Sequence, residues 1–141
     1  MSTPALITAI NKAIEAHTTW KHRLSHAILT GGCEISSKMA CCDDQCQLGM
    51  WLYGNTIDHL TRAHVSYQEV QQLHAEFHRS AGSVLAYVER DMMSAAQFLM
   101  DGEFEVLSQM LIDALDEWKY ALADNIFVTV PRAMPVEARL S

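Results

Sequence analysis

The sequence contains few basic residues and no cluster of them. Lysine and arginine number 10 against 17 aspartates and glutamates, so the formal net charge is −7. Binding to nucleic acid or to anionic lipid requires a basic face, so we expect neither partner. Charged residues make up 19% of the chain, below the usual ~25%. This low fraction predicts an additional apolar surface, such as the interface of a homodimer.

Long hydrophobic runs are also missing. No segment approaches the ~18 uninterrupted apolar residues of a membrane span. The N-terminus, MSTPALITAI, has no basic stretch ahead of an apolar run, so we expect no secretory signal. These features predict a cytoplasmic protein whose thiols stay reduced. Its four cysteines are then better explained as metal ligands or redox-sensitive thiols than as a disulfide framework.

Apolar residues recur at intervals of three and four, which predicts helices. The first predicted helix begins near Pro4 and ends where a loop over residues 31–42 opens with two glycines. A second, shorter helix is predicted to be capped by an aspartate at 43–44, to carry Cys46 and to end at Gly54.

The second half of the chain predicts two longer helices. The segment 56–66 has no clear pattern and receives no assignment. A helix is predicted from about residue 67 to about residue 100, where Asp101-Gly102 is expected to break it. A further helix follows over 104–122, with apolar residues again spaced by three and four.

Together these elements predict an all-α fold. We expect an antiparallel, four-helix-bundle-like domain over residues 1–124, in which one short helix carries the cysteine at position 46. Residues 125–141 contain two prolines and are expected to form an extended or disordered tail.

The predicted helices carry four candidate metal ligands: His17, Cys46, His74 and His78. His17 falls near the centre of the apolar seam of its helix. Cys46 falls in a first turn, where the helix dipole favours a thiolate. His74 and His78 are four residues apart, so they project from the same side of their helix. One thiolate and three imidazoles suit tetrahedral Zn²⁺ and fill all four positions, which favours a sensing or structural site over a catalytic one.

Each candidate ligand also has a simpler interpretation. An inward-facing histidine is often a core residue bonded to a backbone carbonyl, and the alternative for Cys46 is burial as a small hydrophobic side chain. His22 and His26 are also four residues apart, but they fall on the polar side of the first helix and are expected to be solvated. Cys41 and Cys42 precede Cys46 closely and are competing ligands.

Three short runs resemble the bacterial chemoreceptor zinc-binding domain family. The runs are AHTTWKHRL over 16–24, CQLGMWL over 46–52 and HAEFH over 74–78. The family shows His-x-x-Trp-Lys, then Cys-x-x-Gly-x-Trp, then His-x-x-x-His, in that order. The resemblance covers about residues 5–90, and residues 103–123 are similar to a further helix of members attached to diguanylate cyclases.

The resemblance implies a helical bundle that holds Zn²⁺ through three histidines and one cysteine: His17, Cys46, His74 and His78. It further implies a regulatory, often dimeric domain without catalytic activity, of the kind found on chemoreceptors and diguanylate cyclases. In such domains zinc, or oxidation of the ligating cysteine, alters the output of a signalling partner. Two features depart from the family. We expect neither a cyclase segment nor a receptor signalling region within these residues, so the chain is either a stand-alone sensor or an excised one, and Cys33, Cys41 and Cys42 are additional.

Four accessory residues lie close to the ligands in sequence. Gly49 is expected to let two helices approach closely near the metal. Trp20 and Trp51 either shield the site from water or pack in the core. Lys21 lies inside an apolar seam, so it is expected to reach the edge of the bundle or to pair with a carboxylate.

Two other functions compete with zinc sensing. A di-iron, hemerythrin-like bundle needs inward-facing carboxylates, yet the sequence has no Glu-x-x-His pair, and Glu69, Glu76 and Glu89 fall mainly outside the seam. A metal-free interaction module with buried histidines is the second alternative.

Overall fold

The computed structural model describes residues 2–124, in which no strand is present and helices dominate. The all-α prediction is confirmed, whereas the predicted tail over 125–141 lies outside the described residues. In chain order the elements are α1 (Thr3–Thr30), α2 (Ser37–Ala40), α3 (Gln47–Tyr53), α4 (His59–Ala63), α5 (Val65–Glu89), α6 (Met93–Leu99), the π-helix η1 (Met100–Phe104) and α7 (Glu105–Ala123).

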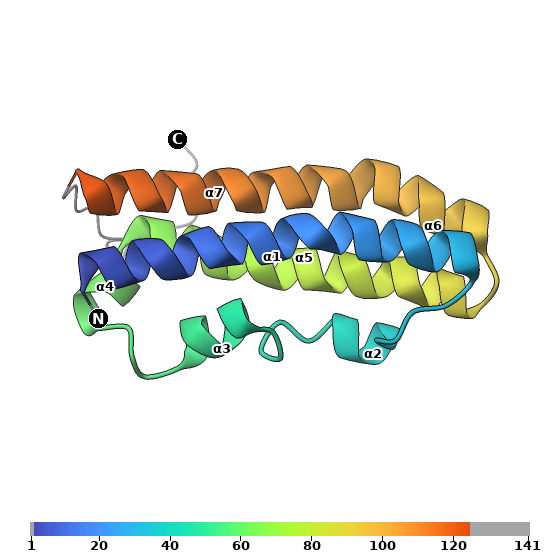
Figure 1. Cartoon of the computed structure of the whole chain (residues 1–141), viewed down its shortest axis with the longest axis horizontal. Helices are drawn as coiled ribbons and strands as arrows, with labels where there is room; N and C mark the ends of the chain where they lie inside the picture. Colours follow the sequence, from blue (N-terminus) through green and yellow to red (C-terminus); the bar gives the residue numbers. More distant parts are fainter. Residues whose placement is uncertain (1, 125–141) are drawn as a thin grey trace, which may run out of the picture.

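Three long rods form the body of the molecule (Figure 1). The first is α1, the second is α5, and the third is α6, η1 and α7 in succession. The third rod runs antiparallel to the other two, while α1 and α5 run in the same direction. This is possible because residues 31–64, with α2, α3 and α4, carry the chain back along one side of the bundle; α2 contacts α5, and α3 contacts α1.

The ends of α1 follow from its sequence. Ser2 is the N-cap, and its hydroxyl accepts a hydrogen bond from the backbone N–H of Ala5. Pro4 occupies the first turn, where no intrahelical donor is lost. At the other end Gly31 adopts φ 82°, the left-handed conformation that terminates helices. Both predicted boundaries are therefore confirmed.

The core lies between the three rods. Its largest side chains include Phe77 of α5, Phe104 of η1 and Trp118 of α7, all of them fully buried. The rings of Phe77 and Phe104 are 5.0 Å apart between centroids. This apolar core holds the long helices in place relative to one another. Side chains of α1 and α5 that lie at the same level along the bundle axis therefore face each other.

The crossing segment differs from the prediction at two points. The predicted loop over 31–42 contains the four-residue helix α2, which is capped by the hydroxyl of Ser36. The N-cap of α3 is Cys46 itself, and neither aspartate at 43–44 has that role. The cysteine side chain takes the place of the usual oxygen acceptor and receives a hydrogen bond from the N–H of Gly49.

The predicted break at Asp101-Gly102 is wrong. The helix that carries the histidine pair ends at Glu89, and the chain turns at Asp91, a non-glycine residue with φ 59°. Gly102 lies inside η1, where the helical backbone continues into α7. A single glycine destabilises a helix by only about 1 kcal/mol, which tertiary packing readily offsets.

Candidate metal centre

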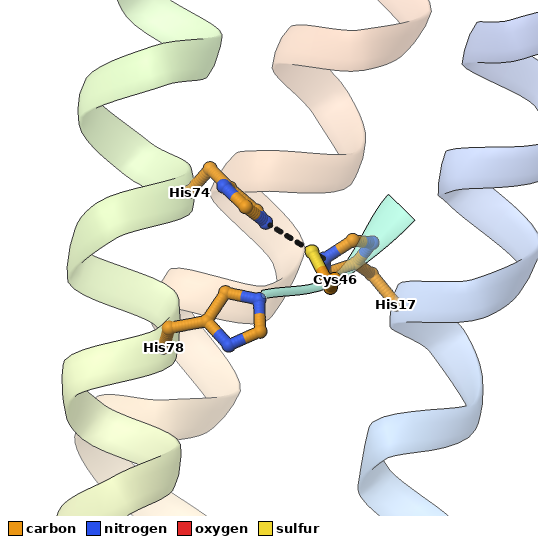
Figure 2. Close-up of side chains that lie close together, drawn as sticks. All are labelled: His17, Cys46, His74 and His78. Carbon is orange, nitrogen blue, oxygen red and sulfur yellow. Dashed lines mark hydrogen bonds between the residues drawn. The ribbon is translucent and has the colours of Figure 1, made fainter. Parts of the chain in front are cut away.

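Four side chains from three separate segments meet between α1 and α5. His17 comes from α1, Cys46 from the N-cap of α3, and His74 and His78 from successive turns of α5. One ligand atom from each residue lies within 4.8 Å of the corresponding atoms of all the others. Figure 2 shows the three imidazoles directed toward the cysteine sulfur. Among residues 2–124 this is the one group of such side chains close enough to hold a metal ion.

The distances within the group suit a tetrahedral ion. The sulfur of Cys46 lies 3.1 Å from Nε2 of His74 and 4.0 Å from Nε2 of His17. Zinc bonds of ~2.3 Å to sulfur and ~2.0 Å to nitrogen place these atoms about 3.5 Å apart across a tetrahedron. The two observed separations bracket that value, and no donor atom lies more than 4.8 Å from another, so the group has about the size of a tetrahedral site.

Backbone carbonyls orient two of the imidazoles. Nδ1 of His17 lies 2.8 Å from the carbonyl of Ala13, and Nδ1 of His78 lies 2.9 Å from the carbonyl of Ala40. A proton on Nδ1 satisfies each carbonyl and leaves the Nε2 lone pair free to bind a metal. Nε2 of His78 is buried and has no hydrogen-bond partner. Such an unpaired polar atom costs about 1–3 kcal/mol, which a bond to a metal would offset.

Burial keeps the three imidazoles neutral, the form that binds metal. It lowers the pKa of His17 from 6.5 to about 4, against a smaller upward effect of the Ala13 carbonyl. Burial, together with repulsion from the imidazoles of His78 and His17, lowers the pKa of His74 to about 2. The pKa of His78 is also lowered, again chiefly by burial. The donor set therefore fits a cation that neutral imidazoles can share.

The surroundings of Cys46 have opposing effects on the pKa of its thiol. Burial raises the pKa of its thiol, whereas hydrogen bonds from the backbone N–H groups of Gly49 and Leu48 lower it. The effect of burial is the larger, so the helix N-terminus alone does not produce the thiolate that the sequence led us to expect. A bound divalent cation supplies the positive charge that stabilises a thiolate in such a site.

Residues 17–85 match the family model of the chemoreceptor zinc-binding domain. The matched range begins at the first candidate ligand, His17, and contains the other three. This part of the chain is a chemoreceptor zinc-binding domain. No curated protein and no solved structure matches the chain. None of the helices in residues 2–124 has the length and apolar character needed to cross a membrane.

In this zinc-binding domain Gly49 has a different role from the one predicted. A Cβ atom at this position would overlap the carbonyl oxygen of Asp43 and lie 3.0 Å from Cα of Asp44. The glycine therefore accommodates the loop immediately before Cys46, since the three atoms nearest to the added Cβ all belong to that loop. Since that loop leads directly into the cysteine, the absence of a side chain at Gly49 helps to place the sulfur.

The aromatic side chains near the candidate ligands pack against different partners. The ring of Trp20 packs edge-on against His78 at 5.6 Å, and Phe77 packs against His17 at 5.1 Å. Both rings pack on the imidazoles, and Trp20 also belongs to the buried core, so its position fits both interpretations. Trp51 instead stacks on Trp118 of α7, with ring centroids 5.5 Å apart and planes 26° from parallel. Phe77 was not expected at the site, because its core position is typical of any apolar seam.

Two other expectations concern residues on α1. Lys21 forms a salt bridge of 2.5 Å with Glu105 of α7, as one of the predicted alternatives required. The two side chains are 42% and 43% exposed, so the pair contributes little to stability. His22 and His26 are exposed and lie outside the ligand group, in agreement with their predicted solvation.

A cavity of about 870 Å³ adjoins the ligands. It lies between α1 and the crossing segment, and His17, Cys46 and His78 reach its wall. Cys42 lines the same cavity, whereas the Cβ of Cys41 faces Gly82 of α5. Small molecules in this cavity therefore have access to both Cys46 and Cys42.

Proposed function

We propose that this chain is a regulatory signalling domain that binds one Zn²⁺ through His17, Cys46, His74 and His78. The observation that carries the proposal is the convergence of these four donor atoms within 4.8 Å, together with the buried, unpaired Nε2 of His78. The proposed domain comprises residues 1–124. Four protein ligands complete a tetrahedral shell, so the site has no open position for a substrate and no catalytic activity is proposed.

The proposed signal depends on how the crossing segment is held. Bound zinc supplies a cross-link between α1, the start of α3 and α5. Cys46 is the one ligand from the crossing segment, and the other three belong to the long helices. Release of Cys46 would therefore loosen the crossing segment from α1 and α5. This change transmits a signal only if a partner has different affinities for the two states.

We propose a signalling protein as that partner, with a chemoreceptor or a diguanylate cyclase as the attached or separate output. The net charge of −7 argues against nucleic acid and anionic membranes as alternatives. A cytoplasmic location is proposed because all four cysteines are unpaired thiols, as is usual in a reducing compartment.

We also propose a homodimer. Large apolar side chains are exposed at one end of α1 and along the third rod: Leu29 is 86% exposed, Phe98 83% and Val106 57%. A partner copy that covered these residues would remove apolar surface from water, which is the main driving force of association. This proposal also accounts for the low fraction of charged residues.

Oxidation is proposed as a second input at the same site. A two-electron oxidant such as hydrogen peroxide transfers one oxygen to the Cys46 thiolate, forming a sulfenic acid and releasing hydroxide. The sulfenic acid is a poor zinc ligand. The Cys42 thiol can then displace water from it to form a disulfide, which a thiol reductant reverses. We favour Cys42 over Cys41 for this step because Cys42 shares a cavity with Cys46.

Elemental analysis of untagged, purified protein tests the proposed metal. The account predicts one zinc per chain. Two irons per chain would favour a hemerythrin-like site, although the ligand group contains no carboxylate. Absence of any metal would favour the third alternative, an interaction module with buried histidines.

A further inference from the structure

The ligand His78 depends on a neighbouring element for its orientation. His17 bonds through Nδ1 to Ala13, one turn earlier in its own helix. His78 instead bonds through Nδ1 to the carbonyl of Ala40, which belongs to α2. The bond is buried and spans 38 residues of sequence. Wherever α2 moves, this carbonyl moves with it, so the position of α2 determines how the His78 ring is held.

The helix α2 is too short to hold that position unaided. It has four residues, and Ala40 is the one among them that is buried. Isolated helices of fewer than ~12 residues are not stable in water, because nucleation is unfavourable. The location of α2 must therefore come from its contacts with α5, the helix on which it rests.

One of these contacts is a carboxylate. The two oxygens of Glu89 accept hydrogen bonds from the backbone N–H of Ser37, at 2.8 Å, and from the Ser37 hydroxyl, at 2.5 Å. These bonds satisfy a free N–H of the first turn of α2 and place a negative charge there, where the helix dipole favours it. Their effect is also evident in the pKa of Glu89, which the hydrogen bonds from Ser37 lower.

Another contact is a close approach of the two backbones. A Cβ atom on Gly82 would lie 2.7 Å from Cβ of Cys41, 3.0 Å from the carbonyl oxygen of Ser37 and 3.1 Å from the backbone nitrogen of Cys41. Any side chain at this position would push α2 away from α5. His78, Gly82 and Glu89 are spaced by four and seven residues, so they form one stripe along α5.

We propose that Gly82 and Glu89 are positioning residues for the zinc ligand His78, and that they act by holding α2 so that the Ala40 carbonyl meets Nδ1. The inference rests on the proposed zinc site and deepens it. Partners of metal-bound histidines typically change metal affinity by about 10- to 100-fold when they are disturbed. Gly82 has no side chain, and the carboxylate of Glu89 bonds to Ser37. The spacing of the candidate ligands in the sequence therefore would not reveal the role of either residue.

The test compares zinc dissociation constants, measured by competition with a chromophoric chelator, for the wild-type chain and two variants. Gly82→Ala is expected to raise the dissociation constant about 10-fold or more, and Glu89→Gln to raise it by a smaller factor. The matched controls are Gly102→Ala, a helical glycine whose added Cβ would meet nothing within 4 Å, and Glu69→Gln, an exposed position on α5. Both controls should bind zinc like the wild type.

Two further measurements separate positioning from general destabilisation. Thermal melting is measured with and without zinc. The melting temperature of each variant should fall below that of the wild type by less in the zinc-free proteins than in the zinc-bound proteins. In a His78→Ala background, Gly82→Ala should cause little further loss of zinc affinity, because the ring that α2 orients is gone. Should Gly82→Ala not fold, Glu89→Gln supplies the same comparison from an exposed side chain.

The outcomes distinguish this inference from the proposed function. Unchanged zinc affinity in both variants, with tight binding by the wild type, overturns the positioning roles and leaves the zinc site intact. If Gly82→Ala causes the same loss of zinc affinity in the wild-type and His78→Ala backgrounds, Gly82 does not act through the hydrogen bond between Ala40 and His78. Failure of the wild-type chain to bind zinc overturns the proposed function and this inference together.

Discussion

The sulfur of Cys46 lies 3.1 Å from Nε2 of His74, although 28 residues separate them in the chain. This contact joins the start of a short helix in the crossing segment to the middle of α5. It is one of several contacts between the crossing segment and the bundle, and it is partly buried. Changes at Cys46, whether by substitution, oxidation or displacement of its loop, should therefore be measurable as changes in metal binding.

The loop before Cys46 is expected to require glycine at position 49. In Gly49→Ala the new methyl group would overlap the Asp43 carbonyl, which is backbone and cannot rotate away. We expect a loss of about 1–3 kcal/mol in the free energy of unfolding, as for other overpacked sites, and weaker zinc binding. Chemical denaturation and chelator competition measure the two effects. Gly102→Ala is the control, and wild-type behaviour of Gly49→Ala would show that the loop relaxes freely.

The zinc-free domain is expected to lose stability in mild acid. The folded-state pKa values of His17 and His74 are about 4 and about 2, below the ordinary 6.5. The unfolded chain therefore binds protons more readily, so the stability is complete above pH 6.5 and falls as the pH decreases toward 4. The free energy of unfolding should then fall by up to about 1.4 kcal/mol per pH unit for each such histidine.

Urea unfolding in EDTA at several pH values between 7.5 and 4.5 measures this dependence. His22→Ala should retain the same slope, because His22 is exposed, whereas His74→Gln should reduce it. A free energy of unfolding that stays constant from pH 7 to 5 would contradict the burial of the imidazoles.

The proposed homodimer is tested by light scattering at micromolar concentration, which should give twice the mass of the 141-residue chain. A charge on the apolar surface should weaken association, so Val106→Asp is expected to shift the mass toward that of a monomer. Asp113→Asn, a substitution at an exposed position of α7, is the control. A monomeric wild-type protein would refute the dimer.

Mild oxidation is expected to release zinc and to form a disulfide between Cys42 and Cys46. Zinc release is followed with a chromophoric chelator, and the disulfide by mass spectrometry. Thiol reductant should restore binding in the wild type and in Cys41→Ser, whereas Cys42→Ser should form no disulfide and recover less. If zinc stays bound and Cys46 remains unmodified under oxidant, the site has no redox role. Equal recovery in both serine variants would leave zinc release intact but remove the trapping step.

Much of the helical fold was predictable because long helices leave a regular apolar pattern. The seam of α1 and its glycine stop identified that helix at both ends, and the spacing of His74 and His78 placed them on one side of α5. The boundary between α5 and α6 was not predictable in this way. It depends on the left-handed conformation of Asp91, whereas Gly102, the expected break, is held within a continuous helix by packing.

The parts of the site that escaped prediction are those made by backbone atoms. The four candidate ligands could be proposed from residue type, helical position and the family resemblance, and the structure brings their donor atoms together. The Ala40 carbonyl was not, because every residue has a carbonyl and α2 is too short to leave a periodic pattern. Gly82 likewise shows its role only when α2 is seen resting on it.

The zinc content of the untagged chain tests the central claim most directly. Elemental analysis should give one zinc per wild-type chain. Alanine at His17, Cys46, His74 or His78 should weaken zinc binding sharply, because each substitution removes one of four converging donors. Alanine at His22 or His26 should leave the affinity unchanged. Full zinc affinity in Cys46→Ala would contradict the assignment of the ligands, and a wild-type chain that holds no zinc would contradict the account as a whole.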